Sequence, residues 1–252
     1  MIIGTVPYLN ALPLISSLPQ TATLVTLTPT ELISAVLKGR LTAGLLPSYS
    51  ILEHGLKSYP EAGLIGCDGA VKSVGFFTRN HIKKLNDIDT IYFDQESQTS
   101  VRLAQIVLHK VFKRNLKSIR TVSLHDSHRA DALMLIGDKA LFFREDGYRY
   151  WDLGETWKSL TGLGFVFASW ASLKPLSKNV VKMLTDARNT GFQNLPNWLQ
   201  NPQNSRDELA LHYLKNNIVY DLTPSLKKGQ AQYHDYLKEL DLCQMAFKRR
   251  VA

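Results

Sequence analysis

The sequence predicts an α/β protein made of two lobes with a ligand cleft between them. Short apolar strands alternate with amphipathic helices along the first part of the chain, which is the order that builds parallel sheets. The length of 252 residues exceeds one minimal domain and suits two lobes of about 100–130 residues each. A composition of 44% hydrophobic and 21% charged residues is that of a folded globular chain.

The first lobe begins with a strand–helix–strand unit. Residues 2–6 and 21–28 are predicted strands, because the first is apolar and the second alternates and is β-branched. The helix that follows has Thr28 or Thr30 as its N-cap, and Gly39 ends it. Its apolar residues recur at helical spacing: Leu32, Ile33, Val36 and Leu37. A short apolar strand at 43–47 then stops at a proline.

Further strands and helices occupy the middle of the chain. Strands or strand–helix segments are expected at 63–66, 71–79, 90–94, 120–124, 132–141 and 165–170. The helix after residue 100 has a periodic apolar face: Val101, Leu103, Ile106, Val107 and Val111. From residue 177 onward the pattern is helical. We therefore expect residues 1–73 plus 171–252 to form the first lobe, with a helical C-terminal part, and residues 74–170 to form an inserted second lobe. This is the type II periplasmic-binding-protein-like fold.

Charge and cysteine content limit the classes of partner. The formal net charge is +8 with scattered basic residues, which suits a small anionic ligand. No zinc finger, glycine-rich RNA motif or basic heptad pattern is present, so no nucleic acid is expected. Cys67 and Cys243 form neither metal-ligand spacing nor a disulfide framework. Residues 1–4 show no secretory signal and no apolar run has membrane length, so we expect a cytoplasmic protein without membrane contact.

Three polar clusters stand at strand ends or helix starts, where open α/β sheets bind ligands. Tyr8 and Asn10 follow the first strand, although an asparagine there also suits a helix cap. Hydroxyl residues at 97–100 precede a helix whose free N–H groups attract anions, and plain capping explains part of this pattern. Ser73 and Thr78 lie in the strand expected to cross between lobes, with hydroxyls toward either the cleft or solvent.

Other candidates carry less weight. Asp138 follows an apolar run and either lines the cleft or caps a helix. The polar loop at 125–131 holds two histidines and two aspartates, but no further His or Cys follows at a useful spacing, which favours a surface loop over a metal site. The nucleophile elbow, the dinucleotide fingerprint and the phosphate loop are all missing from the sequence.

Six fragments follow one another in a recognisable order: IGTVPYLNALPL, PTELISAVLKGRLTAGLLP, DGAVKSVGFFTR, SQTSVRLAQIVL, IGDKAL and DLGETWKSLTGLGFVFASW. Together with YLKNNIVYDLTPSLKKGQAQYHDYL near the end, they resemble the chorismate dehydratase family of the futalosine route to menaquinone. The resemblance runs from Ile3 to about Trp170 and covers most of the chain. It implies the same two-lobed fold.

The resemblance implies removal of water from chorismate, a dicarboxylate, to give 3-[(1-carboxyvinyl)oxy]benzoate, without a metal or organic cofactor. The implied catalytic residues are Asn10, in the first substrate loop, and Ser73, in the crossing strand. The expected substrate-binding residues are Tyr8, Pro47, Ser48, Thr78, Ser97, Thr99, Ser100 and Asp138. Since the three clusters contain no carboxylate or histidine, we expect the enolpyruvyl carboxylate of the substrate to take the proton. Asp138 is the rival base.

Three positions depart from the family pattern. Thr42 stands where aspartate is common, Thr78 where serine is usual, and Gly164 where proline usually precedes the aromatic pair. Two other functions stay open. One is the sister enzyme that makes 1,4-dihydroxy-6-naphthoate from a cyclic futalosine derivative, although its first loop differs from PYLN. The other is a non-catalytic binding protein for a small aromatic or cyclic carboxylate.

Overall fold

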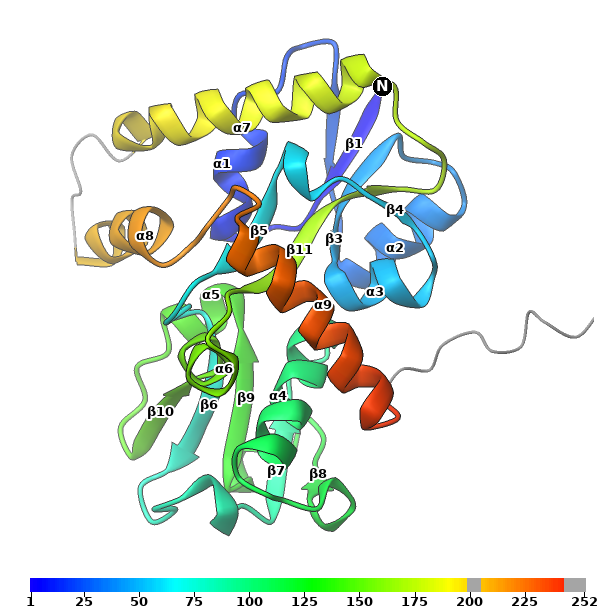
Figure 1. Cartoon of the computed structure of the whole chain (residues 1–252). Coiled ribbons are helices and arrows are strands. Elements are labelled where there is room, and N and C mark those ends of the chain that lie inside the picture. The colour runs from blue at the N-terminus through cyan, green and yellow to red at the C-terminus, as the bar shows by residue number, and fades with distance from the viewer. Residues whose placement is uncertain (199–204, 243–252) are drawn as a thin grey trace, which may run out of the picture.

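Two separate β-sheets lie one above the other in Figure 1, each with helices packed against it. The computed structural model describes residues 1–198 and 205–242, so Cys243 lies outside the described residues. The upper sheet holds the start of the chain, and the lower sheet holds its middle. This arrangement gives the two lobes that the strand pattern predicts.

The first sheet has the order β2-β1-β3-β11-β4, with β5 also paired to β11. Its strands are β1 (Ile2–Thr5), β2 (Thr23–Thr26), β3 (Ala43–Pro47), β4 (Lys57–Ser58), β5 (Leu64–Cys67) and β11 (Phe165–Ser172). Strand β1 is parallel to β2 and β3, whereas β11 runs antiparallel to β3 with Ala168 opposite Pro47. Ladder hydrogen bonds along the whole of β11 place this strand in the first sheet. The lobe boundary expected at residue 170 is therefore wrong, because residues 165–170 belong to the first lobe.

The second sheet has the order β10-β6-β9-β7-β8. Its strands are β6 (Val74–Arg79), β7 (Thr90–Phe93), β8 (Arg120–Thr121), β9 (Ala132–Ile136) and β10 (Tyr148–Asp152). Strand β7 is parallel to β8 and β9, and β6 is antiparallel to β9 and β10. The alternation patterns predicted every strand of this sheet except β10.

Capping side chains set where several helices begin. The helices are α1 (Leu12–Ile15), α2 (Pro29–Leu37), α3 (Ser48–Glu53), α4 (Gln98–Lys110), α5 (Gly137–Leu141), α6 (Leu153–Thr161), α7 (Lys178–Trp198), α8 (Ser205–Asn216) and α9 (Pro224–Glu239). Thr28, Ser97, Asp152 and Thr223 each accept the backbone N–H three residues on. Gly39 follows α2 with φ +69°, as predicted for a helix-ending glycine.

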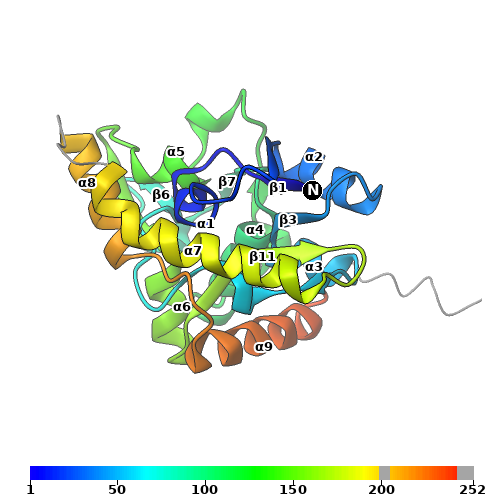
Figure 2. The ribbon, with the colours of Figure 1, turned by 90° about the horizontal axis from the view of Figure 1, so that it is seen from above.

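The C-terminal helices cover more than the first lobe. Helix α7 lies along α1 (Figure 2), so that part of the tail does pack on the first lobe. Helix α9 contacts both β11 and α4, and the Tyr233 hydroxyl donates to the Thr99 carbonyl at 3.1 Å. The tail therefore bridges the lobes, because one helix packs on elements of both. A continuous apolar core extends through both lobes beneath it.

The three departures from the family pattern have local partners here. The Thr42 hydroxyl accepts the Ile2 N–H at 3.3 Å, and the buried Thr78 hydroxyl accepts the Trp151 indole N–H at 3.0 Å. Gly164 donates its N–H to Ser225 Oγ at 2.9 Å. Proline has no N–H and could not make this bond, so glycine at this position suits the contact with α9.

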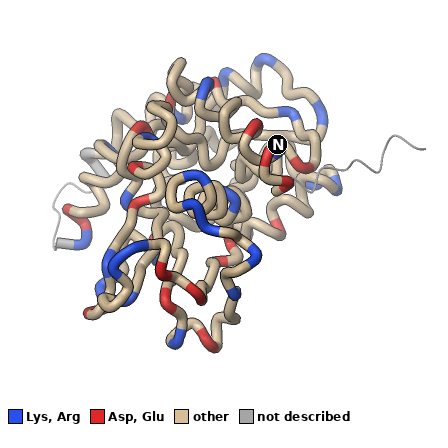
Figure 3. Tube along the Cα trace, turned by 60° about the horizontal axis from the view of Figure 1, so that its bottom comes forward, with Lys and Arg blue, Asp and Glu red and all other residues tan. Residues whose placement is uncertain are grey.

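Charged residues are distributed over both lobes. Figure 3 shows Lys and Arg interspersed with Asp and Glu along the trace. In the described part of the chain, no helix combines the length and the apolar character needed to cross a membrane. Within the same residues, no group of three or more His, Cys, Asp or Glu side chains is arranged to hold a metal ion.

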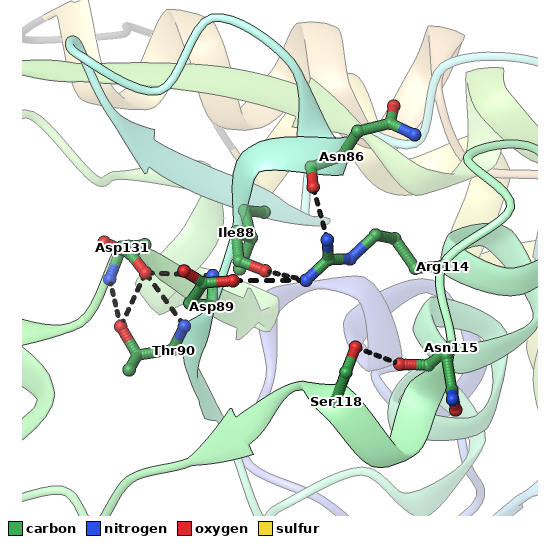
Figure 4. A network of polar contacts seen from close by, with 8 residues as sticks. All are labelled: Asn86, Ile88, Asp89, Thr90, Arg114, Asn115, Ser118 and Asp131. Carbon is green, nitrogen blue, oxygen red and sulfur yellow. Dashed lines mark hydrogen bonds and ion pairs between the residues drawn. The ribbon is translucent and has the colours of Figure 1, made fainter.

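A polar network fixes the loop that enters β7, at the end of the second lobe (Figure 4). The Asp131 carboxylate accepts the N–H groups of Asp89 and Thr90 at 3.0 and 2.8 Å, and the Thr90 hydroxyl at 2.8 Å. Arg114 donates to the carbonyls of Asn86 and Ile88, both at 2.6 Å. These charge-assisted bonds hold the segment from Asn86 to Thr90, where the chain passes into β7.

Replacing Asp131 by asparagine is expected to destabilise the protein by about 1–3 kcal/mol near neutral pH. Burial alone would raise the pKa of Asp131, but the hydrogen bonds from Thr90 and Asp89 outweigh it and hold the pKa below its usual value. The stabilisation is therefore complete above about pH 4, the unfolded-state pKa, and is lost as the pH falls through the lower folded-state pKa. Urea unfolding of the wild-type protein and of Asp131→Asn, measured from pH 7 to pH 3, should show that the difference in their free energies of unfolding becomes smaller in acid. A difference that does not change with pH would contradict this role.

Candidate functional site

A cleft between the two sheets collects residues from both lobes. Its polar lining side chains are Tyr8, Asn10, Ser73, Glu96, Ser97 and Ser100. Its apolar walls come from β3, β5, β6, β9 and β11, together with Val6, Pro29 and Val71. The empty space between these side chains is about 570 Å³, including the part open to solvent. Apolar walls with a few polar groups among them are typical of small-molecule sites.

The loop after β1 reaches from the first lobe onto the second. The Tyr8 hydroxyl donates to the Glu96 carboxylate, and the Leu9 N–H donates to Asp138 Oδ1 at 3.2 Å. The Tyr8 ring lies against Gly137, which has φ +59° and where a Cβ would lie 3.2 Å from the ring. Burial, and then the neighbouring Glu96 carboxylate, raise the pKa of Tyr8, so the phenol keeps its proton as a donor. The second lobe thus positions the loop that carries Asn10.

Asn10, Tyr213 and Ser73 form a hydrogen-bonded chain at the cleft. Asn10 Nδ2 donates to the Tyr213 hydroxyl at 3.2 Å, and that hydroxyl donates to Ser73 Oγ at 2.7 Å. Asn10 Oδ1 is buried and has no hydrogen-bond partner within the described residues. An unpaired buried carbonyl costs roughly 1–3 kcal/mol, so this oxygen is suited to accept a bond from a ligand donor.

Glu96 is the one carboxylate among the described lining residues, and none of those residues is His, Lys or Arg. Lys139 Nζ lies 2.8 Å from Glu96 Oε1 and 3.3 Å from Asp94 Oδ2. Burial alone would raise the pKa of Glu96, but the hydrogen bonds from Lys139 and Tyr8 outweigh it and hold the pKa below its usual value. Glu96 is therefore ionised and already engaged, which makes it a weak proton acceptor.

The start of α4 supplies two hydroxyls to the cleft. Ser97 Oγ accepts the Ser100 N–H at 3.2 Å and donates to Ser100 Oγ at 3.1 Å, and both residues line the cleft. Thr99 points elsewhere, because its hydroxyl accepts the Tyr49 N–H at 3.0 Å. The positive end of this 13-residue helix favours an anion beside the two serines.

The structure brings together Tyr8, Asn10, Pro47, Ser73, Ser97 and Ser100 of the residues expected at the site. Four others do not line the cleft. Ser48 donates to the Val166 carbonyl at 2.8 Å, and Thr78 and Thr99 are buried with the partners described above. Asp138 holds the Leu9 N–H, and burial raises its pKa. Of these four, Asp138 holds the loop that carries Asn10, and the other three bond to residues that do not line the cleft.

Sequence reasoning missed Glu96, Gly137 and Tyr213. Glu96 directly precedes the 97–100 cluster, and Gly137 follows an apolar strand, so both had a local signal. Tyr213 had none, because it lies 203 residues from Asn10 and 140 from Ser73. Burial raises the pKa of Tyr213, which keeps it a neutral phenol able to donate to Ser73.

Solved structures confirm the predicted two-lobed fold class. A protein from Archaeoglobus fulgidus matches with a TM-score of 0.71 and 12% identity, over 96% of this chain and 97% of that chain. The periplasmic aliphatic sulphonate binding protein SsuA from Escherichia coli matches with a TM-score of 0.65 and 14% identity, over 100% and 96%. The alkanesulfonate-binding protein SsuA from Xanthomonas axonopodis pv. citri, bound to MOPS, matches with a TM-score of 0.62 and 16% identity, over 96% and 93%.

A family model gives a more specific match than the solved structures. The model described as menaquinone biosynthesis matches residues 1–239, which is nearly the whole chain.

Proposed function

This chain belongs to the menaquinone biosynthesis family, and on that premise we propose that it is a chorismate dehydratase. The reaction would convert chorismate to 3-[(1-carboxyvinyl)oxy]benzoate and water. The family makes the chain a biosynthetic enzyme, and the six ordered sequence fragments support the particular reaction. The ligand would be a small cyclic dicarboxylate held in the cleft between the lobes.

The observation that carries this proposal is the unpaired Asn10 Oδ1 beside Ser73 in the cleft. Chorismate has a ring hydroxyl that can donate to this oxygen. The Ser73 hydroxyl accepts from Tyr213 and keeps its own proton to donate. The serines at the start of α4 would receive a carboxylate, so neutral groups and a helix dipole would hold the dianion without a cationic side chain.

The proposed dehydration uses a carboxylate of the substrate itself as the base. The C3–H bond breaks and its proton passes to the enolpyruvyl carboxylate, while the electron pair forms the C3–C4 double bond. The C4–O bond breaks, and the leaving oxygen takes up the proton that the enolpyruvyl carboxyl received and departs as water, so that the substrate dianion becomes the product dianion and one water. Glu96 is already bound to Lys139 and Tyr8, which supports a base outside the protein. A well-oriented intramolecular base can lower a barrier by roughly 7–11 kcal/mol.

Incubating the purified protein with chorismate tests this function. We expect an aromatic product, seen as new ultraviolet absorbance and as loss of one water in the mass spectrum. A preparation of an inactive variant made in the same way excludes a contaminating enzyme. Binding of chorismate without product would favour a non-catalytic binding protein. Turnover of a cyclic futalosine derivative instead of chorismate would favour the sister enzyme, and either result would contradict the dehydratase.

A further inference from the structure

The segment that crosses from β5 to β6 is held by one buried carboxylate at the start of α6. Asp152 Oδ1 accepts the N–H groups of Val71 and Glu155, both at 3.0 Å. Asp152 Oδ2 accepts the Lys72 N–H at 2.7 Å and the Tyr150 hydroxyl at 3.0 Å. Only the bond from Glu155 is needed to cap α6. The consecutive amides of Val71 and Lys72 make a two-pronged contact that a plain helix cap does not require.

Close backbone contact reinforces this attachment. A Cβ at Gly154 would lie 2.6 Å from the Gly69 carbonyl oxygen, 2.7 Å from Cys67 Sγ and 3.0 Å from Val71 Cβ. The first turn of α6 therefore packs directly on the crossing segment with no room for a side chain. Hydrogen bonds and packing independently fix the same stretch of backbone.

The attachment holds an unfavourable backbone conformation next to a cleft residue. Lys72 has φ +63°, a value that glycine adopts freely but that residues with a side chain, apart from asparagine and aspartate, rarely adopt. Its side chain is exposed, so packing of that side chain does not explain the conformation. The next residue is Ser73, which is 1% exposed and lies in the cleft with Asn10. Because Ser73 directly follows Lys72, a change of φ at Lys72 would rotate the backbone that carries the Ser73 hydroxyl bonded to Tyr213.

We propose that Asp152 is a positioning residue of the active site: its carboxylate holds Lys72 in the left-handed conformation and thereby directs Ser73 into the cleft. This inference rests on the proposed dehydratase function. Asp152 does not line the cleft itself, and it acts through the backbone of the crossing segment, in which it holds the amides of the lining residue Val71 and of Lys72. An asparagine offers one acceptor oxygen, so it can keep at most two of the four bonds, and its amide would face N–H donors.

Kinetics of Asp152→Asn test the role directly. We expect kcat for chorismate to fall by about 10²-fold, since a misplacement of about 1 Å can cost that much, with a smaller change in KM. Combining Asp152→Asn with Ser73→Ala should lower kcat little beyond Ser73→Ala alone, because both changes remove the same contact. Full additivity of the two losses, or a wild-type kcat in Asp152→Asn, would overturn the proposal.

Adding a glycine at position 72 shows whether Asp152 acts by holding the backbone of Lys72 or only by stabilising the fold. Glycine adopts positive φ without strain, so adding Lys72→Gly to Asp152→Asn should recover about tenfold in kcat. Lys113→Gly is the matched control, because Lys113 is also an exposed lysine with positive φ (53°) and lies in the loop after α4. Equal recovery by the control would overturn the proposal. If Asp152→Asn does not fold, Lys72→Val should lose more kcat than Lys72→Gly; equal values would contradict it.

A crystal structure of Asp152→Asn makes the test independent of turnover. We expect Lys72 to leave positive φ and the 2.7 Å bond between Tyr213 and Ser73 to be lost. An unchanged Lys72 and an intact bond would refute the positioning role even if the enzyme is active. Conversely, absence of wild-type turnover with these structural changes present would refute the dehydratase function alone.

Discussion

Replacing Asn10 by alanine is expected to lower kcat for chorismate by about 10²–10³-fold. Removing one preorganised hydrogen-bonding group from an active site typically has an effect of this size. Asn10 Oδ1 is buried and has no hydrogen-bond partner among the residues that the structure describes, and Nδ2 fixes its direction through Tyr213. Alanine removes both the acceptor and the contact that orients it, so the substrate would lose a bond on the reacting side of the ring.

The fold should survive this change. Asn10 is half-buried, and the side-chain hydrogen bond that it donates to Tyr213 is worth about 1 kcal/mol. Thermal unfolding followed by circular dichroism should therefore show only a small loss, while steady-state kinetics show the large one. Asn80→Ala, at an exposed position outside the cleft, is the matched control and should keep the wild-type rate. Near-normal turnover in Asn10→Ala would remove Asn10 from the mechanism.

Asp138 is the alternative base, and the same assay separates the two residues. Its carboxylate accepts the Leu9 N–H, and burial raises its pKa above the usual value, which makes this carboxylate a stronger base than an exposed one. If Asp138→Asn abolished turnover with chorismate binding intact, proton transfer would belong to this side chain. On the substrate-assisted mechanism, Asp138→Asn should cost much less than Asn10→Ala, because Asp138 only supports the loop.

Replacing Gly229 by alanine is expected to destabilise the protein by about 3 kcal/mol, the upper part of the usual range for overpacking. A Cβ at this position of α9 would lie 1.8 Å from the Gly164 carbonyl oxygen and 3.5 Å from Leu163 Cβ. The obstacle is backbone rather than the end of a flexible side chain, so α9 must shift. Such a loss corresponds to a fall in Tm of about 6–12 °C for a chain of this size.

Whether Gly229→Ala lowers or raises the stability of the protein distinguishes an effect of packing from an effect of helix propensity. In an exposed helix, glycine to alanine is stabilising by about 1 kcal/mol. Lys228→Ala, at the neighbouring exposed position of α9, is the control and should change Tm little. Because α9 contacts both β11 and α4, Gly229→Ala should also loosen the attachment between the lobes. A neutral or raised Tm, measured by calorimetry, would show that α9 does not pack this closely on Gly164.

Local sequence patterns predicted most of the elements but not how far the lobes extend. The helix from Pro29 was predicted with Thr28 or Thr30 as its cap and Gly39 at its end, and Thr28 is the cap, because propensity and capping act within a few residues. A strand at 165–170 was also predicted, where β11 (Phe165–Ser172) lies, yet it was assigned to the wrong lobe. An apolar pattern predicts a strand but does not indicate which sheet the strand joins, because β3, its neighbour in the sheet, lies more than 100 residues earlier in the sequence.

By itself, the sequence determined the alternation of strands and helices, the polar loop of Tyr8 and Asn10, and the serines that begin α4. These features depend on burial and hydrogen bonding between near neighbours. Only the tertiary structure decided that Tyr213 joins Asn10 to Ser73, that Glu96 meets Tyr8, and that Thr78 and Thr99 face the interior. Such pairings arise when distant segments pack together, and a hydroxyl in the sequence has no fixed direction until that packing chooses its partner.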